Sequence, residues 1–166
     1  TKHGEHGNAL LSRWPVLQHR HEDMSDHRLE QRGLLHVTLQ IQEREVHVIV
    51  IHLGLLPGSR IRQTQQLHDF IEREVPADAP LLVAGDFNDW GNAVAKMMAT
   101  VGLHTDEGRP HPTYPSRLPL VQLDHVYARG VHRVATHVPR GPIWGRMSDH
   151  LPLLVAVSYT HLTLPT

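Results

Sequence analysis

Two apolar runs in the first third of the chain predict a β-hairpin. In residues 33–42, every second side chain from Leu35 to Ile41 is apolar, so these side chains would share one face of a strand. Residues 46–53 (VHVIVIHL) are almost continuously apolar and rich in β-branched side chains, which is typical of a buried strand. Only a short polar connection separates the two runs, so we expect the strands to pair.

The spacing of apolar residues then changes to three and four, which predicts two helices. Residues 60–75 follow this spacing after a Pro-Gly-Ser break at residues 57–59. Residues 92–101 follow it over a shorter stretch, and Gly102 directly after them is typical of a helix C-cap. A short buried strand, residues 81–84, is expected between the two helices.

The remaining segments predict short strands and loops around this centre. Strands are expected in residues 7–13, 123–128, 131–138 and 153–158, and loops in residues 19–32 and 109–119. No internal repeat and no long linker divides the chain. The elements together predict a mixed α/β domain with mostly antiparallel hairpins and two helices.

Length and composition narrow the class of protein. A chain of 166 residues suits one domain, and no apolar run approaches the roughly 20 residues that a membrane-spanning helix needs. The absence of cysteine excludes disulfides, thiolate zinc sites and a cysteine nucleophile, and it fits a reducing compartment, so a cytoplasmic location is expected. The net charge of -1 provides no global basic field for nucleic acid, so such a substrate would need a local basic patch or a bound metal.

The chain contains 16 histidines, which admits two interpretations. One is a compositional bias that leaves histidines exposed on the surface. The other is a histidine-rich metal-binding protein. The histidines are scattered and form neither a dense tract nor an HExxH helix, which favours the first interpretation.

A polar cluster follows the buried strand at residues 81–84. Asp86 could accept a proton from water or hold a metal, and Asn88 could donate a hydrogen bond to a phosphoryl oxygen. The alternative is an Asx-rich turn in which Asp89 caps the following helix.

Further polar residues border other apolar segments. Asp124 begins an apolar strand, and a carboxylate in such a context needs a partner, for which a histidine is suited. Asp149 and His150 precede the last apolar run, and His52 ends the run at residues 46–53. The alternatives are an exposed strand-start Asp, a polar turn and an ordinary edge histidine.

Taken in order, these pieces resemble successive motifs of the endonuclease/exonuclease/phosphatase superfamily, whose members are DNase I-like. The matching motifs are GNALLSR at residues 7–13, IHL at 51–53, GDFN at 85–88, LDHV at 123–126 and SDH at 148–150. The segments HLGL and TYPSRLP are similar to a bacterial subgroup of this family, and the similarity covers about residues 4–158. It implies a fold of two packed β-sheets flanked by helices in four layers.

The resemblance implies a catalytic role for most of the matched residues. Asp86 would orient or deprotonate the attacking water or hold a metal, and Asn88 would contact the scissile phosphate. His150 would polarise a phosphate oxygen while Asp124 holds its ring, and His52 would be a second histidine beside the phosphate.

Two further matches concern the metal and the frame of the site. By the same resemblance Asp149 would bind the metal together with Asp86, whereas Asn8 would be structural. The family also carries an Asn and then a metal-ligating Glu ahead of its Gly-Asn segment, and Glu5 lies in the wrong place to substitute for the latter. We therefore expect residues 1–158 to form a partial domain, incomplete at its N-terminus, and residues 159–166 to be a non-native tail.

The function that we expect is metal-assisted hydrolysis of a phosphoester by in-line attack of water. Hard oxygen ligands without any thiolate favour Mg²⁺ or Mn²⁺. A phosphodiesterase acting on nucleic acid is the first candidate, and a phosphatase or phospholipase is the second. A local basic patch could come from Arg109, Arg117, Arg129 and Arg133. A non-catalytic fragment without the Glu ligand stays open as a different class, as does the histidine-rich metal binder.

Overall fold

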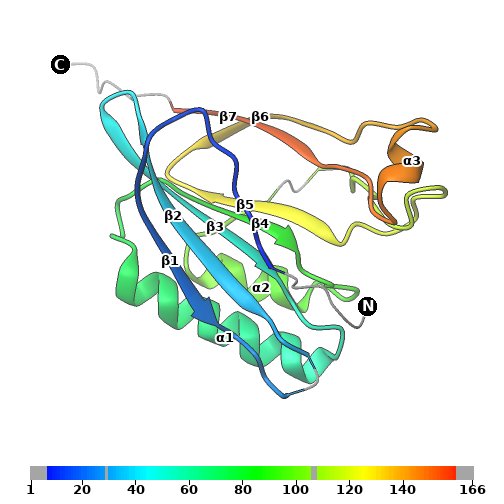
Figure 1. Ribbon diagram of the computed structural model, residues 1–166, viewed down its shortest axis with the longest axis horizontal. Helices are drawn as coiled ribbons and strands as arrows, with labels where there is room; N and C mark the ends of the chain where they lie inside the picture. Colours follow the sequence, from blue (N-terminus) through cyan, green and yellow to red (C-terminus); the bar gives the residue numbers. More distant parts are fainter. Residues whose placement is uncertain (1–6, 29, 106–107, 160–166) are drawn as a thin grey trace.

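The computed structural model describes residues 7–28, 30–105 and 108–159. In these residues it has a five-stranded sheet, a two-stranded sheet and three helices. The strands are β1 (Val16–Asp23), β2 (Gly33–Ile41), β3 (Arg44–His52), β4 (Leu81–Asp86), β5 (Asp124–Arg129), β6 (His132–His137) and β7 (Leu154–Ser158). The helices are α1 (Pro57–Glu74), α2 (Ala93–Thr100) and α3 (Trp144–Met147). Figure 1 shows α1 and α2 on one side of the larger sheet and the β6–β7 hairpin on the other side.

The larger sheet has the strand order β1-β2-β3-β4-β5. Its neighbouring strands are antiparallel, as expected, with the exception of β3 and β4, which run parallel. Helix α1 makes the crossover between these two strands, because parallel neighbours cannot be joined by a tight turn. The crossover brings the ends of β3 and β4 to the same edge of the sheet.

The main core lies between this sheet and the helices. Leu67 and Phe70 of α1 pack with Ile49 of β3 and Val83 of β4, and all four side chains are buried. Burial of this apolar surface is the main favourable term in folding. The core therefore fixes α1 against the centre of the sheet, directly below the strands that carry the polar clusters.

The opposite face of the sheet carries a second apolar cluster. Leu35, Val37 and Leu39 share this face, as the alternation predicts, and they pack with Val46 and Val48 of the neighbouring strand. Strands β2 and β3 are thus buried on both faces, which explains why the sequence of β3 is almost continuously apolar.

The N-terminal part of the sequence prediction is wrong in two places. Residues 7–13 form no strand, and β1 lies at Val16–Asp23, largely within the segment predicted as a surface loop. Strand β1 is the edge strand of the sheet and most of its side chains are exposed, so its pairing with β2 leaves no apolar pattern in the sequence. Asn8 donates hydrogen bonds to the carbonyls of Gly33 and Val50 at 2.7 and 3.0 Å. These bonds hold the segment at residues 7–13 against the sheet, although it forms no strand.

The helices agree more closely with their patterns. Helix α1 begins at Pro57 rather than Arg60, because proline is favoured at the first helical position, where its missing N–H costs nothing. Gly102 adopts a φ of 71°, which confirms it as the residue that ends α2. Helix α3 was not predicted, because four residues are too few for a periodic signal.

The C-terminal tail expected at residues 159–166 lies mostly outside the described residues. Of this segment the structure describes Tyr159, whose ring lies 4.0 Å from the guanidinium carbon of Arg44. No helix in the described part of the chain is long and apolar enough to cross a membrane.

Candidate active site

Three of the predicted site residues form a row across three neighbouring strands. His52 at the end of β3 pairs in register with Asp86 at the end of β4, and Asp86 pairs with Asp124 at the start of β5. Side chains directly opposite each other in a sheet have Cβ atoms roughly 4.5–5.5 Å apart. The strand register alone therefore brings one imidazole and two carboxylates together at one edge of the sheet.

Gly85 makes this row possible because β4 approaches β3 very closely at that point. Its φ is 151°, and a Cβ atom added there would lie 1.8 Å from the carbonyl oxygen of Ile51. A larger residue would push the strands apart or bend the backbone. The glycine of the GDFN motif therefore lets Asp86 lie beside His52.

His150 completes the cluster from a loop that precedes β7. Its Nδ1 lies 2.8 Å from Oδ2 of Asp124, which confirms the expected pairing of these two residues. The hydroxyl of Thr113 donates to the same carboxylate oxygen at 2.6 Å. Because a carboxylate accepts, Nδ1 of His150 carries the hydrogen, and its Nε2 faces Oδ2 of Asp86 at 3.8 Å.

Hydrogen bonds between loops hold His150 in place. The backbone N–H of Ser116 donates to the carbonyl of Asp149 at 2.7 Å, and that of Leu151 donates to the carbonyl of Thr113 at 2.8 Å. These bonds tie the residues on both sides of His150 to the loop before β5. The position of this imidazole thus depends on polar contacts rather than on a packed core.

The electrostatics separate the two histidines. Burial and the charge of Arg32 lower the pKa of His52, although the charge of Asp86 opposes this shift. For His150, burial also favours the neutral ring, but the hydrogen bond and charge of Asp124 outweigh burial and raise its pKa. The site therefore favours a neutral His52 beside a His150 that holds a proton more strongly.

The pKa of Asp86 is raised as well. Burial is the main cause, and the nearby charge of Asp124 adds to it. The backbone N–H of Asn88 donates to Oδ1 of Asp86 at 2.9 Å and opposes the shift. Asp86 is therefore a stronger base than an ordinary carboxylate, which suits proton transfer from water.

The GDFND cluster combines the two roles that the sequence allowed, a residue facing the site and a cap for the following helix, at different residues. Asn88 is 3% exposed, and its side-chain nitrogen donates to the carbonyl of Leu53 at 2.9 Å. The carboxylate of Asp89 accepts hydrogen bonds from the backbone N–H groups of Ala93 and Val94 at 3.1 and 3.0 Å. Asp89 therefore caps α2, and Asp86 is the residue that faces the site.

Asp149 is the predicted metal ligand that lies apart from the cluster. Its side chain is exposed, and Oδ1 lies 3.4 Å from the hydroxyl of Ser148. The group whose ligand atoms lie within 4.8 Å of one another consists of Asp86, Asp124 and His150. The structure thus brings together four of the predicted residues, with His52 3.4 Å from Asp86, and leaves Asp149 outside this group.

The donor set fits a divalent metal ion. Asp86 and Asp124 supply the carboxylate oxygens that Mg²⁺ and Mn²⁺ prefer, and the chain has no thiolate that would favour a softer ion. The raised pKa of Asp86 is consistent with two carboxylates that share a partly buried site without enough positive charge.

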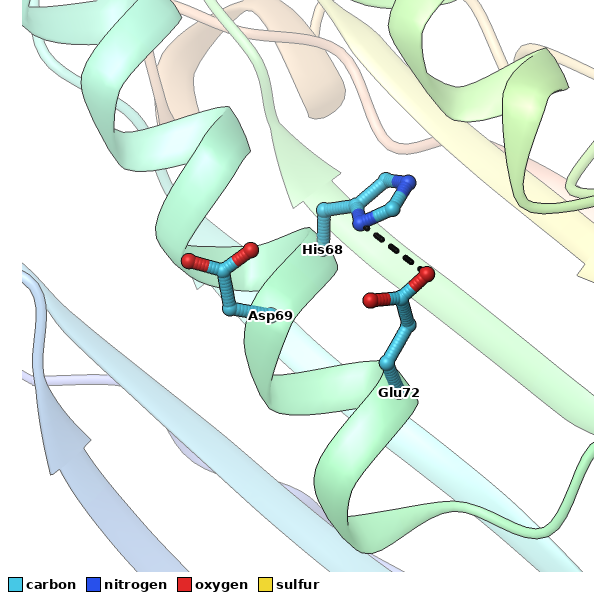
Figure 2. Close-up of side chains that lie close together, drawn as sticks. All are labelled: His68, Asp69 and Glu72. Atoms are coloured by element: carbon cyan, nitrogen blue, oxygen red, sulfur yellow. Dashed lines mark ion pairs between the residues drawn. The ribbon is translucent and has the colours of Figure 1, made fainter.

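A second group of possible ligands lies on the outer surface of α1. Figure 2 shows His68 and Glu72 pointing toward one another one helical turn apart, and their Nδ1 and Oε1 atoms are 3.7 Å apart. Asp69 instead accepts a hydrogen bond from Gln65 at 2.8 Å. Pairs at this spacing are common on exposed helix faces, so we assign no function to this group.

An aromatic pair that the sequence motifs did not single out lies beside the cluster. The ring of Tyr114 lies 4.9 Å from that of His150, and the ring of Trp90 lies 6.1 Å from that of Tyr114. Trp90 is 57% exposed. The signal was present in the sequence, because Trp90 directly follows GDFND and Tyr114 lies in the TYPSRLP segment.

The predicted basic patch is not formed as proposed. Arg117 lines one hollow of the surface, whereas Arg129 and Arg133 line another. Arg129 and Arg133 also donate to backbone carbonyls, including those of Val101 and Val126. Arg129 and Arg133 are separated from Arg117 because β5 runs from Asp124 at the site to Arg129 at its other end.

Comparison with known proteins supports the same family. The model of the endonuclease/exonuclease/phosphatase family matches residues 1–150. The uncharacterized protein YbhP of Escherichia coli (strain K12) is 36% identical over 157 residues, which are 90% of this chain and 62% of YbhP. The chain thus spans less than two thirds of the length of this relative.

Solved structures are similar in fold at lower identity. TDP2 of D. rerio in complex with a single-strand DNA product has a TM-score of 0.64 at 18% identity, over 86% of this chain and 68% of that chain. A mannosyl-6-phosphatase of Bacteroides thetaiotaomicron VPI-5482 has a TM-score of 0.69 at 14% identity, over 88% of this chain and 67% of that chain. The family match and these folds lead to one conclusion: the chain belongs to the endonuclease/exonuclease/phosphatase family and has its DNase I-like fold.

Proposed function

We propose that this site hydrolyses a phosphodiester by in-line attack of a water molecule, with the help of a divalent metal ion. Membership of the family supports the broader statement that the protein is a phosphoester hydrolase. The observation that carries the proposal is the His150–Asp124 pair at 2.8 Å, which faces Asp86 at the same edge of the sheet. This arrangement offers an acid and a base to one bound phosphate.

His150 binds and polarises a phosphate oxygen. Asp124 holds its Nδ1–H, so Nε2 is the nitrogen that can meet the substrate. The raised pKa of His150 favours the protonated ring, which donates a hydrogen bond to the oxygen on which negative charge develops in the transition state. Asp124 positions this ring and does not itself touch the substrate.

Asp86 orients the attacking water and accepts its proton. The backbone N–H of Asn88 donates to its Oδ1 at 2.9 Å, and His52 at 3.4 Å from Oδ2 can exchange a hydrogen bond with it, so the carboxylate is held in place beside the water. The resemblance implies that Asn88 would also contact the scissile phosphate.

Asp86 would hold the metal ion, as the resemblance implies, whereas the second implied ligand, Asp149, is exposed and lies outside the group of close ligand atoms. When bound, Mg²⁺ or Mn²⁺ supplies positive charge that stabilises the phosphoryl oxygens. The family resemblance also implies a Glu ligand ahead of the Gly-Asn segment, and Glu5 lies in the wrong place to supply it.

Two substrate classes are favoured by different observations. Trp90 and Tyr114 offer aromatic faces near His150, and unpaired bases stack on such faces, which favours single-stranded nucleic acid. Exposed aliphatic side chains on two neighbouring segments favour a lipid phosphoester as the second candidate, and they include Leu118 in the loop before β5 and Ile143 at the start of α3.

The test is hydrolysis of bis-p-nitrophenyl phosphate by the protein, including any residues that precede or follow this chain in its gene. We expect turnover with Mg²⁺ or Mn²⁺, its loss with a chelator, and slower hydrolysis of p-nitrophenyl phosphate. Asp86→Asn and His150→Ala should each lower kcat about 10²–10⁴-fold. The control is His132→Ala, an exposed histidine on β6.

Three outcomes would contradict the proposal. Near-normal turnover in either site variant would show that the roles are misassigned. Turnover that survives chelation would exclude the metal ion. The absence of turnover with both metals and both substrates would favour a non-catalytic protein with the same fold.

A further inference from the structure

Large apolar side chains gather on the surface next to the active site. They lie on α3 and on the loop at residues 116–120, which sit at one end of the molecule in Figure 1. Leu118, Ile143 and Met147 are 66%, 72% and 70% exposed. Leu120 and Trp144 belong to the same two segments and are also exposed. Single exposed apolar residues are ordinary, but a group of this size marks an interaction surface.

The loop at residues 116–120 and the segment that contains α3 line a basic hollow in the surface. It has a volume of about 480 Å³ and is lined by Arg117, Arg140 and Arg146, with no carboxylate among its lining residues. The segments are in contact, because a Cβ atom added at Gly145 would lie 3.7 Å from Cγ of Arg117. We call these two segments, residues 116–120 and 140–147, the docking surface.

The arginines of the docking surface differ from those of the main sheet and α1. Within the described part of the chain, none of the three forms a hydrogen bond or an ion pair through its guanidinium group. By contrast, Arg62 holds Asp26 with two hydrogen bonds of 2.5 Å, and Arg73 holds Glu22 at 2.9 Å. The positive charge of the docking surface is therefore available to an anionic partner.

The combination of side chains decides which anionic partner fits. Nucleic acid would use the arginines and an aromatic face, but it gives no role to exposed Leu, Ile and Met side chains. A bilayer surface uses all of them: apolar and Trp side chains enter the boundary between headgroups and acyl chains, and arginines meet the lipid phosphates. From this combination we propose that the docking surface binds an anionic lipid bilayer, with lipid phosphates in the arginine hollow and the apolar side chains in the bilayer boundary.

Binding in this way would bring the active site close to the membrane. Ser116 and Leu151 line the hollow, and Leu151 directly follows His150. Ser116 also bonds through its hydroxyl to the carbonyl of Ser148 at 2.7 Å. The inference does not depend on hydrolysis, but if the surface binds lipid, it favours the lipid phosphoester over nucleic acid as substrate.

The test is co-sedimentation of the protein with vesicles, at fixed low salt. One set of vesicles contains phosphatidylcholine alone, and in the other a third of the lipid is phosphatidylglycerol. We expect binding to the anionic vesicles and weak binding to the neutral ones. The charge variant Arg117→Gln with Arg146→Gln should lower the partition coefficient about tenfold or more. The apolar variant Ile143→Ser with Met147→Ser should lower it by a similar factor.

Matched controls come from exposed residues elsewhere. Arg28→Gln removes an exposed arginine of the β1–β2 loop, and Leu11→Ser removes a leucine that is 98% exposed. Both should bind anionic vesicles as the unchanged protein does. All the substituted side chains are at the surface, so thermal melts should confirm that the variants remain folded.

Several results would overturn the inference. They are equal binding to neutral and anionic vesicles, unchanged binding in either double variant, the same loss in the controls, and binding of single-stranded DNA without any binding of vesicles. The readout is sedimentation rather than turnover. A failure here therefore leaves the proposed hydrolysis untouched, and a failure of hydrolysis leaves this test intact.

Discussion

The two ends of this molecule handle charge and apolar surface in opposite ways. Under the large sheet, apolar side chains such as Leu67 and Phe70 are buried, and surface arginines such as Arg62 pair with carboxylates. Around α3, apolar side chains such as Ile143 are exposed and the arginines have no such partner in the described chain. The side chains of the first region therefore contribute mainly to stability. Those of the second region can contact a partner, because the large sheet already supports the loops that carry them.

The candidate active site lies at the border between these regions. His52 and Asp86 come from central strands whose register is fixed by the core. His150 comes from the loop that follows α3 and depends on hydrogen bonds to Asp124 and to the neighbouring loop. Substitutions made in one region at a time test this comparison between the two regions.

Gly85→Ala should have the largest effect on stability. The added Cβ atom would lie 1.8 Å from the carbonyl oxygen of Ile51, and the φ of 151° is unfavourable for alanine. We expect a loss of about 3 kcal/mol or more in the free energy of unfolding, measured by urea denaturation. Gly91→Ala is the matched control, because its Cβ would meet nothing within 4 Å. Equal stability of the two variants would show that β3 and β4 can separate freely.

His36 should make the helix-covered region sensitive to acid. His36 is 6% exposed, and its Nε2 lies 2.9 Å from Nδ1 of His47, so burial and this neighbour both disfavour the charged ring. Burial, with the charge of His47, lowers the pKa of His36 to about 4. The unfolded chain binds this proton more readily, so stability is complete above about pH 6.5 and falls as the pH drops towards 4.

The expected loss is on the order of 2 kcal/mol between pH 7 and pH 4.5. Urea denaturation at several pH values should show this slope in the unchanged protein and a flatter one in His36→Gln, which cannot take up the proton. His132→Gln, on the exposed β6 strand, should keep the original slope. An unchanged slope in His36→Gln would mean that the acid sensitivity arises elsewhere.

The arginine substitutions should have the smallest effect and should differ by region. Arg62→Gln leaves Asp26 without its main partner, which holds the pKa of that carboxyl well below its usual range, so the melting temperature at pH 7 should fall slightly. Arg146→Gln removes no such contact and should leave the melting temperature unchanged. If both variants melt alike, the contrast between paired and unpaired arginines has no consequence for stability.

The sequence predicted best what burial dictates. Strands β2 and β3 and helix α1 carry the apolar periods of their buried faces, so their positions could be derived within a few residues. Strand β1 could not be derived, because an edge strand with exposed side chains is fixed by backbone pairing alone. The parallel pairing of β3 with β4 could not be derived either. The sequence predicts the helix between the two strands, but it does not indicate beside which strand the chain rejoins the sheet after that helix.

The candidate site shows the same division. Its motifs identify Asp86, Asp124 and His150, and the structure brings them together as expected. Tyr114 lies in a motif that the sequence already offered, whereas Thr113 could not be assigned, because its contact with Asp124 arises from the folding of a loop. For the same reason, the sequence did not indicate that Arg117 would line one hollow with Arg140 and Arg146.

The most direct test of the account is a double-mutant cycle on Asp124 and His150. The 2.8 Å contact implies that Asp124 acts through His150, by fixing its proton on Nδ1 and raising its pKa. We measure kcat on bis-p-nitrophenyl phosphate for Asp124→Asn, His150→Ala and the double variant. Each single variant should be about 10²-fold slower or more, and the double variant should be no slower than His150→Ala alone. Losses that multiply in the double variant would show that the two residues act independently, which would contradict the proposed site.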